Sequence, residues 1–113
     1  MTARLPIFRL CTVVFAAAIL FLSLQPSTGQ ASIPHADKVQ HVLAYGVLAV
    51  LTGLGWPRLR RVWLIVLPAL FGVGVEVLQG AMAMGRTPSV LDAVANTLGA
   101  AIGSALIGRW RSR

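Results

Sequence analysis

Residues 62–79 read VWLIVLPALFGVGVEVLQ, and Glu76 is the only ionisable side chain among them. Roughly 17 to 25 helical residues span the hydrocarbon core of a bilayer, so this run is about long enough to cross it. Backbone amides and carbonyls find no water inside a bilayer and must pair within the segment, which a helix achieves. The stretch therefore predicts a transmembrane helix that carries one intramembrane acid.

Three further apolar runs accompany this one, at residues 5–24, 39–56 and 90–108. The 113-residue chain is 57% hydrophobic and 12% charged, unlike a typical soluble domain. The connections between the runs are short, so neighbouring helices run antiparallel. We predict an all-α fold, a polytopic membrane protein with a bundle of four antiparallel transmembrane helices in a single domain over residues 1–113. The first run is longer than the apolar core of a signal peptide, and we expect it to remain uncleaved.

The basic residues are divided unequally between the two ends of this predicted bundle. A net charge of +7 would favour nucleic-acid binding in a soluble protein, but here the charges form short groups between apolar runs. Membrane lipids are therefore the expected partners, and nucleic acid is not. One end holds Arg4, Arg9, Arg58, Arg60, Arg61, Arg109, Arg111 and Arg113, and the other holds Lys38 and Arg86. By the positive-inside rule, we predict that the arginine-rich end and both termini are cytoplasmic.

The remaining ionisable side chains gather near the opposite, external ends of the helices. A helix rises about 1.5 Å per residue, so positions within two turns of a helix end form a shallow layer. Spacings of three and four residues place the polar and small residues of each helix on one face. These stripes are Lys38, His41 and Tyr45; Glu76 and Gln79; and Asp92, Asn96, Gly99 and Gly103. Because a Gly-x-x-x-Gly pair favours close helix packing, we expect the polar layer to face the bundle interior.

Some of these residues also have a purely structural explanation. Asp37 is a candidate helix N-cap, and Asp92 follows a serine by three residues in a capping-box pattern. Glu76 has no basic residue one helical turn away and needs a partner from another helix. The candidate partners are Lys38, Arg86 and His41. An intramembrane acid of this kind indicates a functional site, and an ion pair that fixes helix packing is the alternative.

The polar stripes stand within longer motifs that follow one another along the chain. These are DKVQHVLAYGVLA at 37–49, EVLQ at 76–79, Gly85 with Arg86, and DAVANTLGAAIG at 92–103, and the first helix ends in LSLQP at 22–26. In this order the motifs resemble the VanZ-like family of membrane proteins, over about residues 5–108. The residues that the family would share by position are Asp37, Lys38, His41, Tyr45, Glu76, Gln79, Arg86, Asp92, Asn96 and Gly99.

The resemblance implies a multi-pass protein of the bacterial cytoplasmic membrane, in a family named for a protein linked to resistance to the glycopeptide teicoplanin. We therefore expect a cell-envelope protein that binds an anionic group at the outer face of the membrane, such as a lipid-linked peptidoglycan precursor or a glycopeptide. In this interpretation Lys38 and Arg86 contact the anion, while His41, Gln79 and Asn96 supply hydrogen bonds. The structural residues are then Asp37, Tyr45, Gly99 and Gly103.

Two other functions remain open at this point. One is a membrane enzyme that modifies a lipid-linked envelope precursor, with His41, Glu76 and Asp92 as the catalytic candidates. The other is proton-linked transport through Glu76 and His41, although the arginine-rich half offers no matching polar stripe apart from Thr52. These histidine and carboxylate positions match no metal-ligand motif, so we expect neither a metal nor a cofactor.

Overall fold

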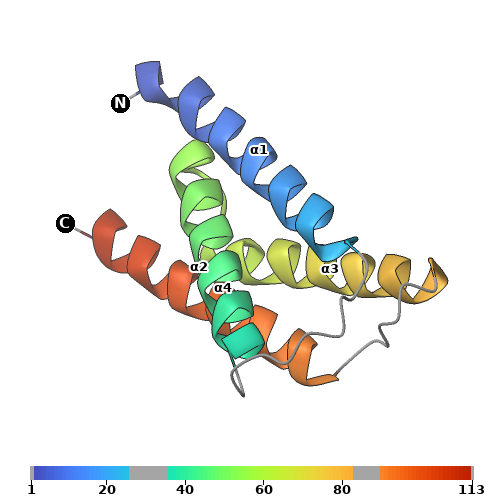
Figure 1. Ribbon diagram of the computed structural model, residues 1–113. Helices are drawn as coiled ribbons and strands as arrows, with labels where there is room; N and C mark the ends of the chain where they lie inside the picture. The colour runs from blue at the N-terminus through green and yellow to red at the C-terminus, as the bar shows by residue number, and fades with distance from the viewer. Residues whose placement is uncertain (1, 26–35, 83–89, 113) are drawn as a thin grey trace.

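The computed structural model describes residues 2–25, 36–82 and 90–112, and in these ranges the chain forms four α-helices (Figure 1). The helices are α1 (Leu5–Ser23), α2 (Ala36–Gly55), α3 (Arg61–Ala81) and α4 (Val90–Arg111), and a single 3-10 turn (Thr2–Arg4) precedes α1. Each α-helix is long and apolar enough to cross a membrane. The predicted all-helical membrane fold with four spans is confirmed.

The helix boundaries follow from local sequence as well as from hydrophobicity. Pro6 stands at the start of α1, where a backbone amide has no hydrogen-bond acceptor within the helix, so the missing amide hydrogen costs nothing. Pro57 stands two residues after Gly55, the last residue of α2, and a proline at this position prevents the helix from continuing. The second and fourth helices exceed their apolar runs, reaching back to Ala36 and on to Arg111. Polar residues extend these helices because backbone hydrogen bonding continues beyond the hydrocarbon boundary.

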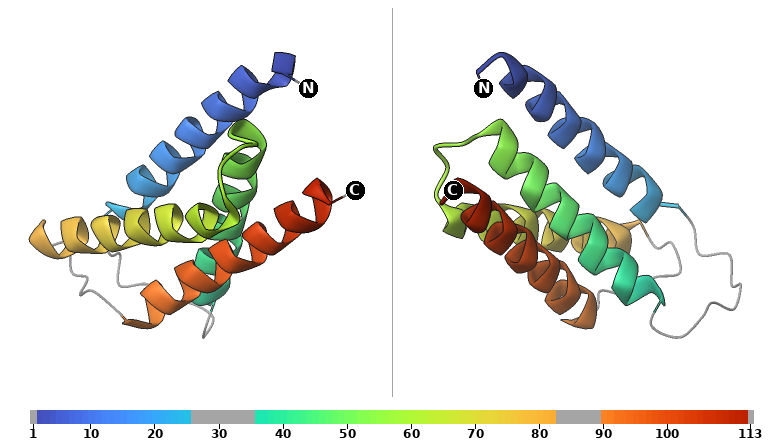
Figure 2. Two further views of the ribbon diagram at one scale, coloured as in Figure 1. Left: turned by 180° about the vertical axis from the view of Figure 1, so that it is seen from behind. Right: turned by 90° about the vertical axis from the view of Figure 1, so that its left-hand side faces the viewer.

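Both chain termini lie at the same end of the bundle as the connection between α2 and α3 (Figures 1 and 2). We call this the arginine end, because the groups around Arg4, Arg58 and Arg109 are there. At the opposite end, here called the polar end, α2 and α4 begin side by side (Figure 2). The antiparallel order along the chain therefore makes α2 and α4 run parallel to each other. Which side of the membrane the arginine end faces remains a prediction.

The tightest packing in the bundle joins α2 and α4, which share its most extensive contact. Gly99 lies directly against the backbone of Val42, and Gly103 lies against the backbone of Gly46. Small residues let membrane helices approach until their backbones touch, and van der Waals contact then stabilises the pair. We call this contact the glycine seam. The Gly-x-x-x-Gly stripe thus packs against α2.

The third helix completes the core, and the first lies at its edge. In α3 the buried residues Leu64, Pro68, Gly72 and Val75 follow one another at helical spacing, so they mark its inward face. By contrast, α1 has no buried residue and contacts mainly α2. The core therefore consists of α2, α3 and α4, with α1 attached along one side.

Three arginines at the arginine end bind backbone carbonyls. Arg9 Nε donates to Gly55 O at 2.7 Å, and Arg61 Nε donates to Ser104 O at 3.1 Å. Arg111 donates to the carbonyls of Gly53, Trp56 and Leu59 at 2.7 to 3.3 Å. The last carbonyls of a helix have no partner within it, and these side chains satisfy several of them for α2. The sequence indicated these arginines only as determinants of membrane orientation, so their role in holding helices together is an addition.

Candidate functional site

An ion pair between Lys38 and Asp92 joins the first turns of α2 and α4. Both residues are third in their helices, and the parallel arrangement brings these turns together. Lys38 Nζ donates to Asp92 Oδ1 at 2.5 Å. The side chains keep relative exposures of 30% and 21%, so the pair is only partly open to its surroundings. The alternative explanation for Asp92, a capping role with Ser89, involves a residue outside the described ranges, and the described part of the chain shows its carboxylate facing a cation from another helix.

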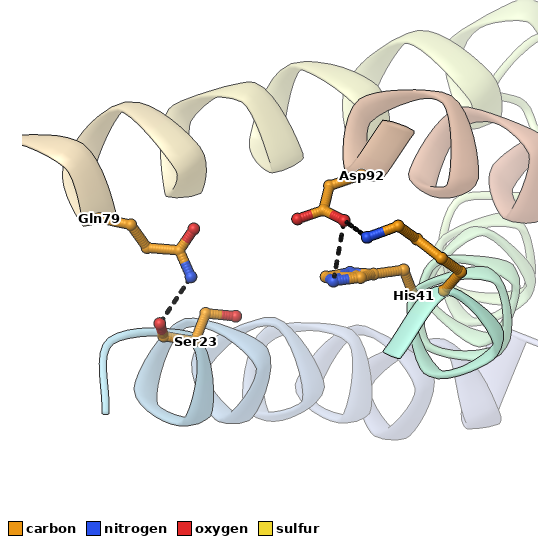
Figure 3. Close-up of polar contacts among 5 residues, drawn as sticks. Ser23, His41, Gln79 and Asp92 are labelled. Carbon is orange, nitrogen blue, oxygen red and sulfur yellow. Dashed lines mark hydrogen bonds and ion pairs between the residues drawn. The ribbon is translucent and has the colours of Figure 1, made fainter. Parts of the chain in front are cut away.

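His41 lies one helical turn below Lys38 and turns toward the same carboxylate (Figure 3). Its Nε2 atom is 3.9 Å from Asp92 Oδ1, which is an ion-pair distance for a protonated ring but too long for a hydrogen bond. Asp92 therefore faces two basic groups through one oxygen atom. These three side chains, which we call the basic-acid trio, form the upper layer of the candidate site.

A second polar layer lies deeper, where α2, α3 and α4 meet. Tyr45 and Asn96 are both 3% exposed. A Cβ added to Gly72 would lie 2.7 Å from Asn96 Nδ2 and 3.3 Å from the Tyr45 hydroxyl, so this glycine makes room for both. The charge of the half-buried Glu76 acts on that same hydroxyl. Side chains from three helices thus converge here, as their sequence spacing indicated.

Asn96 has an unusual position within this layer. Its Oδ1 atom is buried and accepts no hydrogen bond from any residue in the described part of the chain. An unpaired buried acceptor costs about 1 to 3 kcal/mol, so such atoms are uncommon. The Asn96 amide supplies an acceptor just below the trio, but it does not line the groove beside His41 and Asp92.

Gln79 binds the backbone of the first helix. Its Nε2 atom donates to Ser23 O at 2.7 Å, and this contact stands apart from His41 and Asp92 (Figure 3). That Gln79 supplies a hydrogen bond to a ligand stays a prediction. In the structure its side-chain amide fastens the end of α1 to the end of α3. Sequence spacing could not reveal this contact, because its acceptor is a main-chain atom.

An open groove of about 400 Å³ runs between α1 and the basic-acid trio. Its lining combines mainly polar residues of α2 and α4 with mainly apolar residues of α1, namely Ile19, Leu22, Ser23, Gln40, His41, Ala44, Tyr45 and Asp92. Sequence analysis did not single out Gln40, Ala44 or the three residues of α1. Gln40 directly precedes His41, and α1 carries no charged residue at this end that would have drawn attention to it.

Two predicted site residues, Arg86 and Asp37, cannot be placed in this geometry, because Arg86 and the side chain of Asp37 lie outside the described residues. Within the described ranges, no group of three His, Cys, Asp or Glu side chains is arranged to hold a metal ion. The described side chains of the site can form ion pairs and hydrogen bonds and can transfer protons.

Comparison with known protein families identifies the relatives of this chain. The family model described as VanZ/LLP1 matches residues 5–111, nearly the whole sequence. The chain belongs to the VanZ/LLP1 family. The match includes all four helices of the bundle and every residue of the candidate site, so this VanZ/LLP1 protein is a multi-pass membrane protein. No curated protein and no solved structure matches the chain.

Proposed function

We propose that this VanZ/LLP1 protein binds the anionic group of a lipid-linked cell-wall precursor or a glycopeptide in the groove at its polar end. The observation that carries the proposal is an open groove with His41 and Asp92 of the basic-acid trio in one wall and mainly apolar residues of α1 in the other. Lys38 does not line the groove but is bonded to Asp92. Such a groove matches an amphipathic ligand, because the head group can meet His41 and approach Lys38 while the lipid portion lies against α1.

The charges of the trio explain why an anion would be favoured. Lys38 supplies a charged amino group and His41 supplies an imidazole ring, and both lie beside the Asp92 carboxylate. A phosphate or carboxylate arriving there would meet basic groups already in position. Asp92 is thus a positioning residue, whereas Lys38 and His41 contact the ligand. Arg86 is retained in the proposal as a further contact on the basis of its sequence position.

The proposal also includes the setting of the protein. We propose that it resides in the bacterial cytoplasmic membrane with its arginine end inside, as the positive-inside rule predicts. The groove then opens toward the outer leaflet, where lipid-linked wall precursors are displayed and glycopeptides arrive. A change in glycopeptide susceptibility would be one consequence of such binding.

The decisive experiment measures binding of a fluorescent lipid-linked precursor to protein in nanodiscs. Removing Lys38 alone would take from Asp92 its lysine partner, so the informative variant is Lys38→Gln combined with Asp92→Asn, which removes both charges and keeps similar sizes. We expect at least about a tenfold loss of affinity, since charge-assisted hydrogen bonds contribute roughly 1.5 to 3 kcal/mol each. The control is Thr97→Val, because Thr97 is exposed and its hydroxyl bonds only Ala93 O of its own helix.

Wild-type affinity in the double variant would end this proposal. A parallel measurement of teicoplanin susceptibility, at matched protein abundance in the membrane, tests the physiological consequence. There the double variant should behave like a strain lacking the protein, and Thr97→Val should behave like wild type.

A second candidate function, a membrane enzyme, is favoured by one observation. The carboxylate of Asp92 lies 3.9 Å from His41 Nε2, and a carboxylate beside an imidazole can orient it as a general base. The same assay separates the two functions when the ligand is recovered and analysed. Chemical modification of the precursor by wild type, lost in His41→Gln, would favour catalysis over binding.

A further inference from the structure

A second hollow lies at the arginine end, far from the candidate site. Its volume is about 640 Å³, and it is lined by Leu5, Arg9, Trp56, Pro57, Arg58 and Leu59. These residues come from the start of α1 and from the turn that follows α2. The hollow contains two guanidinium groups and no acidic side chain.

The two arginines retain hydrogen-bond donors for a ligand. Arg9 uses Nε to hold Gly55 O and lies 5.3 Å above the ring of Trp56, an arrangement that fixes its guanidinium group. No residue in the described ranges accepts a hydrogen bond from its two Nη atoms. Arg58 is exposed and forms no hydrogen bond to the described residues. A planar guanidinium with free Nη atoms is suited to bind phosphate oxygens.

An apolar furrow continues from this hollow toward the middle of the bundle. The two share Trp56 and Leu59, so they are contiguous. The furrow has a volume of about 350 Å³ and lies between α1 and α3, which barely touch each other, with α2 as its floor. Its far end is formed by Phe71, ten residues into α3, or about 15 Å at 1.5 Å per residue. That length is half the hydrocarbon core and matches one acyl chain of a single leaflet.

The hydroxyl groups of the residues that line the furrow already have hydrogen-bond partners. Thr12 and Thr52 are its hydroxyl-bearing residues, and each hydroxyl bonds a carbonyl of its own helix, Phe8 O at 2.8 Å and Leu48 O at 2.7 Å. Their hydroxyl groups are thus already satisfied, and the surface offered to an occupant is hydrocarbon. A polar or peptide ligand would find no partner here.

We propose that an anionic phospholipid binds at the arginine end, with its phosphate held by Arg9 and Arg58 and one acyl chain in the furrow between α1 and α3. The net charge of the hollow favours an anionic over a zwitterionic head group. Because the furrow adjoins the hollow, a lipid can use both of them. A soluble phosphate would contact only the guanidinium groups, so a lipid fits better.

The position of Trp56, shared by hollow and furrow, allows a direct test by fluorescence quenching. A protein with Trp63→Phe and Trp110→Phe keeps Trp56 as its single tryptophan. It is reconstituted with phosphatidylglycerol and phosphatidylcholine at a fixed ratio, with bromine atoms on the acyl chains of one lipid or the other. We expect brominated phosphatidylglycerol to quench Trp56 with a relative association constant up to about 25-fold above that of phosphatidylcholine, since Arg9 and Arg58 would each favour anionic lipid by about fivefold. A matched protein that keeps only the exposed Trp63 should show a ratio near one.

Two pairs of variants separate the head-group and acyl-chain contacts. Arg58→Gln should lower the preference at Trp56 by about fivefold, because only Arg9 remains, whereas Arg60→Gln, at an exposed position outside the hollow, should leave it unchanged. Ala16→Phe fills the furrow and should lower quenching by both lipids, whereas Ala17→Phe lies on the exposed face and should not. Circular dichroism verifies the helical content of each variant, and the result for Arg58→Gln stands without Ala16→Phe should the latter fail to fold.

The proposal is overturned if Trp56 shows no greater preference than Trp63, or if Arg60→Gln reduces the preference as much as Arg58→Gln. Addition of soluble glycerol phosphate distinguishes a lipid from a free phosphate ligand. We expect no displacement of the brominated lipid at millimolar concentration. Full displacement would show a site for phosphate alone and would refute the role of the furrow.

Discussion

Substituting Gly99 by alanine tests whether the glycine seam sets the distance between α2 and α4. An added Cβ would lie 2.9 Å from Val42 Cα and closer still to Val42 O, whereas ordinary contact begins at 3.4 Å. The obstructing atoms belong to the backbone and cannot rotate away, so α2 and α4 must move apart. The parallel change at Gly74 is a control, because nothing lies within 4 Å of a Cβ at that position.

The two variants differ by a calculable free energy. Replacing glycine by alanine within a helix stabilises it by roughly 0.8 to 1.0 kcal/mol, and both variants gain this contribution. Only Gly99→Ala also overpacks the seam, at about 1 to 3 kcal/mol. We therefore expect Gly99→Ala to be less stable than Gly74→Ala by about 1 to 3 kcal/mol. Gly103→Ala should lower the free energy of unfolding less when it is added to Gly99→Ala than when it is made alone, because one separation of the helices relieves both clashes.

Unfolding in detergent micelles, followed by circular dichroism during titration with dodecyl sulfate, provides the measurement. The same separation of α2 and α4 would stretch the Lys38–Asp92 pair, so precursor binding should weaken in Gly99→Ala and not in Gly74→Ala. Equal stability of the two variants would refute the close approach of the helices at Gly99. If the two substitutions lowered the free energy of unfolding additively, a single separation of the helices could not be what relieves both clashes.

Three further predictions concern polar contacts. Lys38→Met should lower the free energy of unfolding by about 1 to 3 kcal/mol, and adding Asp92→Asn should restore part of it, because the pair is intermediate between exposed and buried; detergent unfolding measures both. Arg111→Met should cost about 1 to 3 kcal/mol in the same assay, since it frees carbonyls at the end of α2. His41→Leu should weaken precursor binding by about tenfold, because leucine keeps the bulk of the imidazole but offers the ligand no hydrogen bond; the nanodisc assay measures the affinity. Wild-type affinity in His41→Leu would contradict a role for the imidazole.

The membrane fold could be predicted from the sequence because the thickness of the bilayer fixes the length of the apolar runs. Each of the four runs corresponds to one helix. The starts and ends were less accurate, since α2 begins at Ala36 and α4 continues to Arg111. Hydropathy locates the hydrocarbon boundary, whereas a helix ends where its backbone hydrogen bonds end.

The facing of the polar stripes could also be predicted, but not which helices they would join. Helical periodicity placed Asp92, Asn96, Gly99 and Gly103 on one side of α4, and in the structure that side meets α2 and α3. A single sequence carries no information on which helix lies next to which. The pairing of Asp92 with Lys38 therefore emerged only from the folded chain.

Contacts to the backbone were beyond prediction. Arg9, Arg61, Arg111 and Gln79 all bind main-chain carbonyls of other helices. Nothing in the sequence distinguishes them from exposed neighbours such as Arg60, because the carbonyl acceptor is present at every residue. The apolar wall that α1 gives to the groove was missed for a related reason, since a lipid-facing leucine and a groove-lining leucine have the same composition.

Stability and ligand access rest on different helix pairs in this bundle. The glycine seam and the Arg61–Ser104 bonds tie α4 to α2 and α3, and none of these contacts involves α1. Both the polar groove and the apolar furrow have α1 as one wall. The side-chain hydrogen bonds that fasten α1 to other described helices lie at its ends, from Arg9 to Gly55 O and from Gln79 to Ser23 O. Because α1 contributes no buried residue, changes on its groove-facing side leave the packing of α2, α3 and α4 intact. Substitutions along its groove-facing side should therefore change binding more than folding.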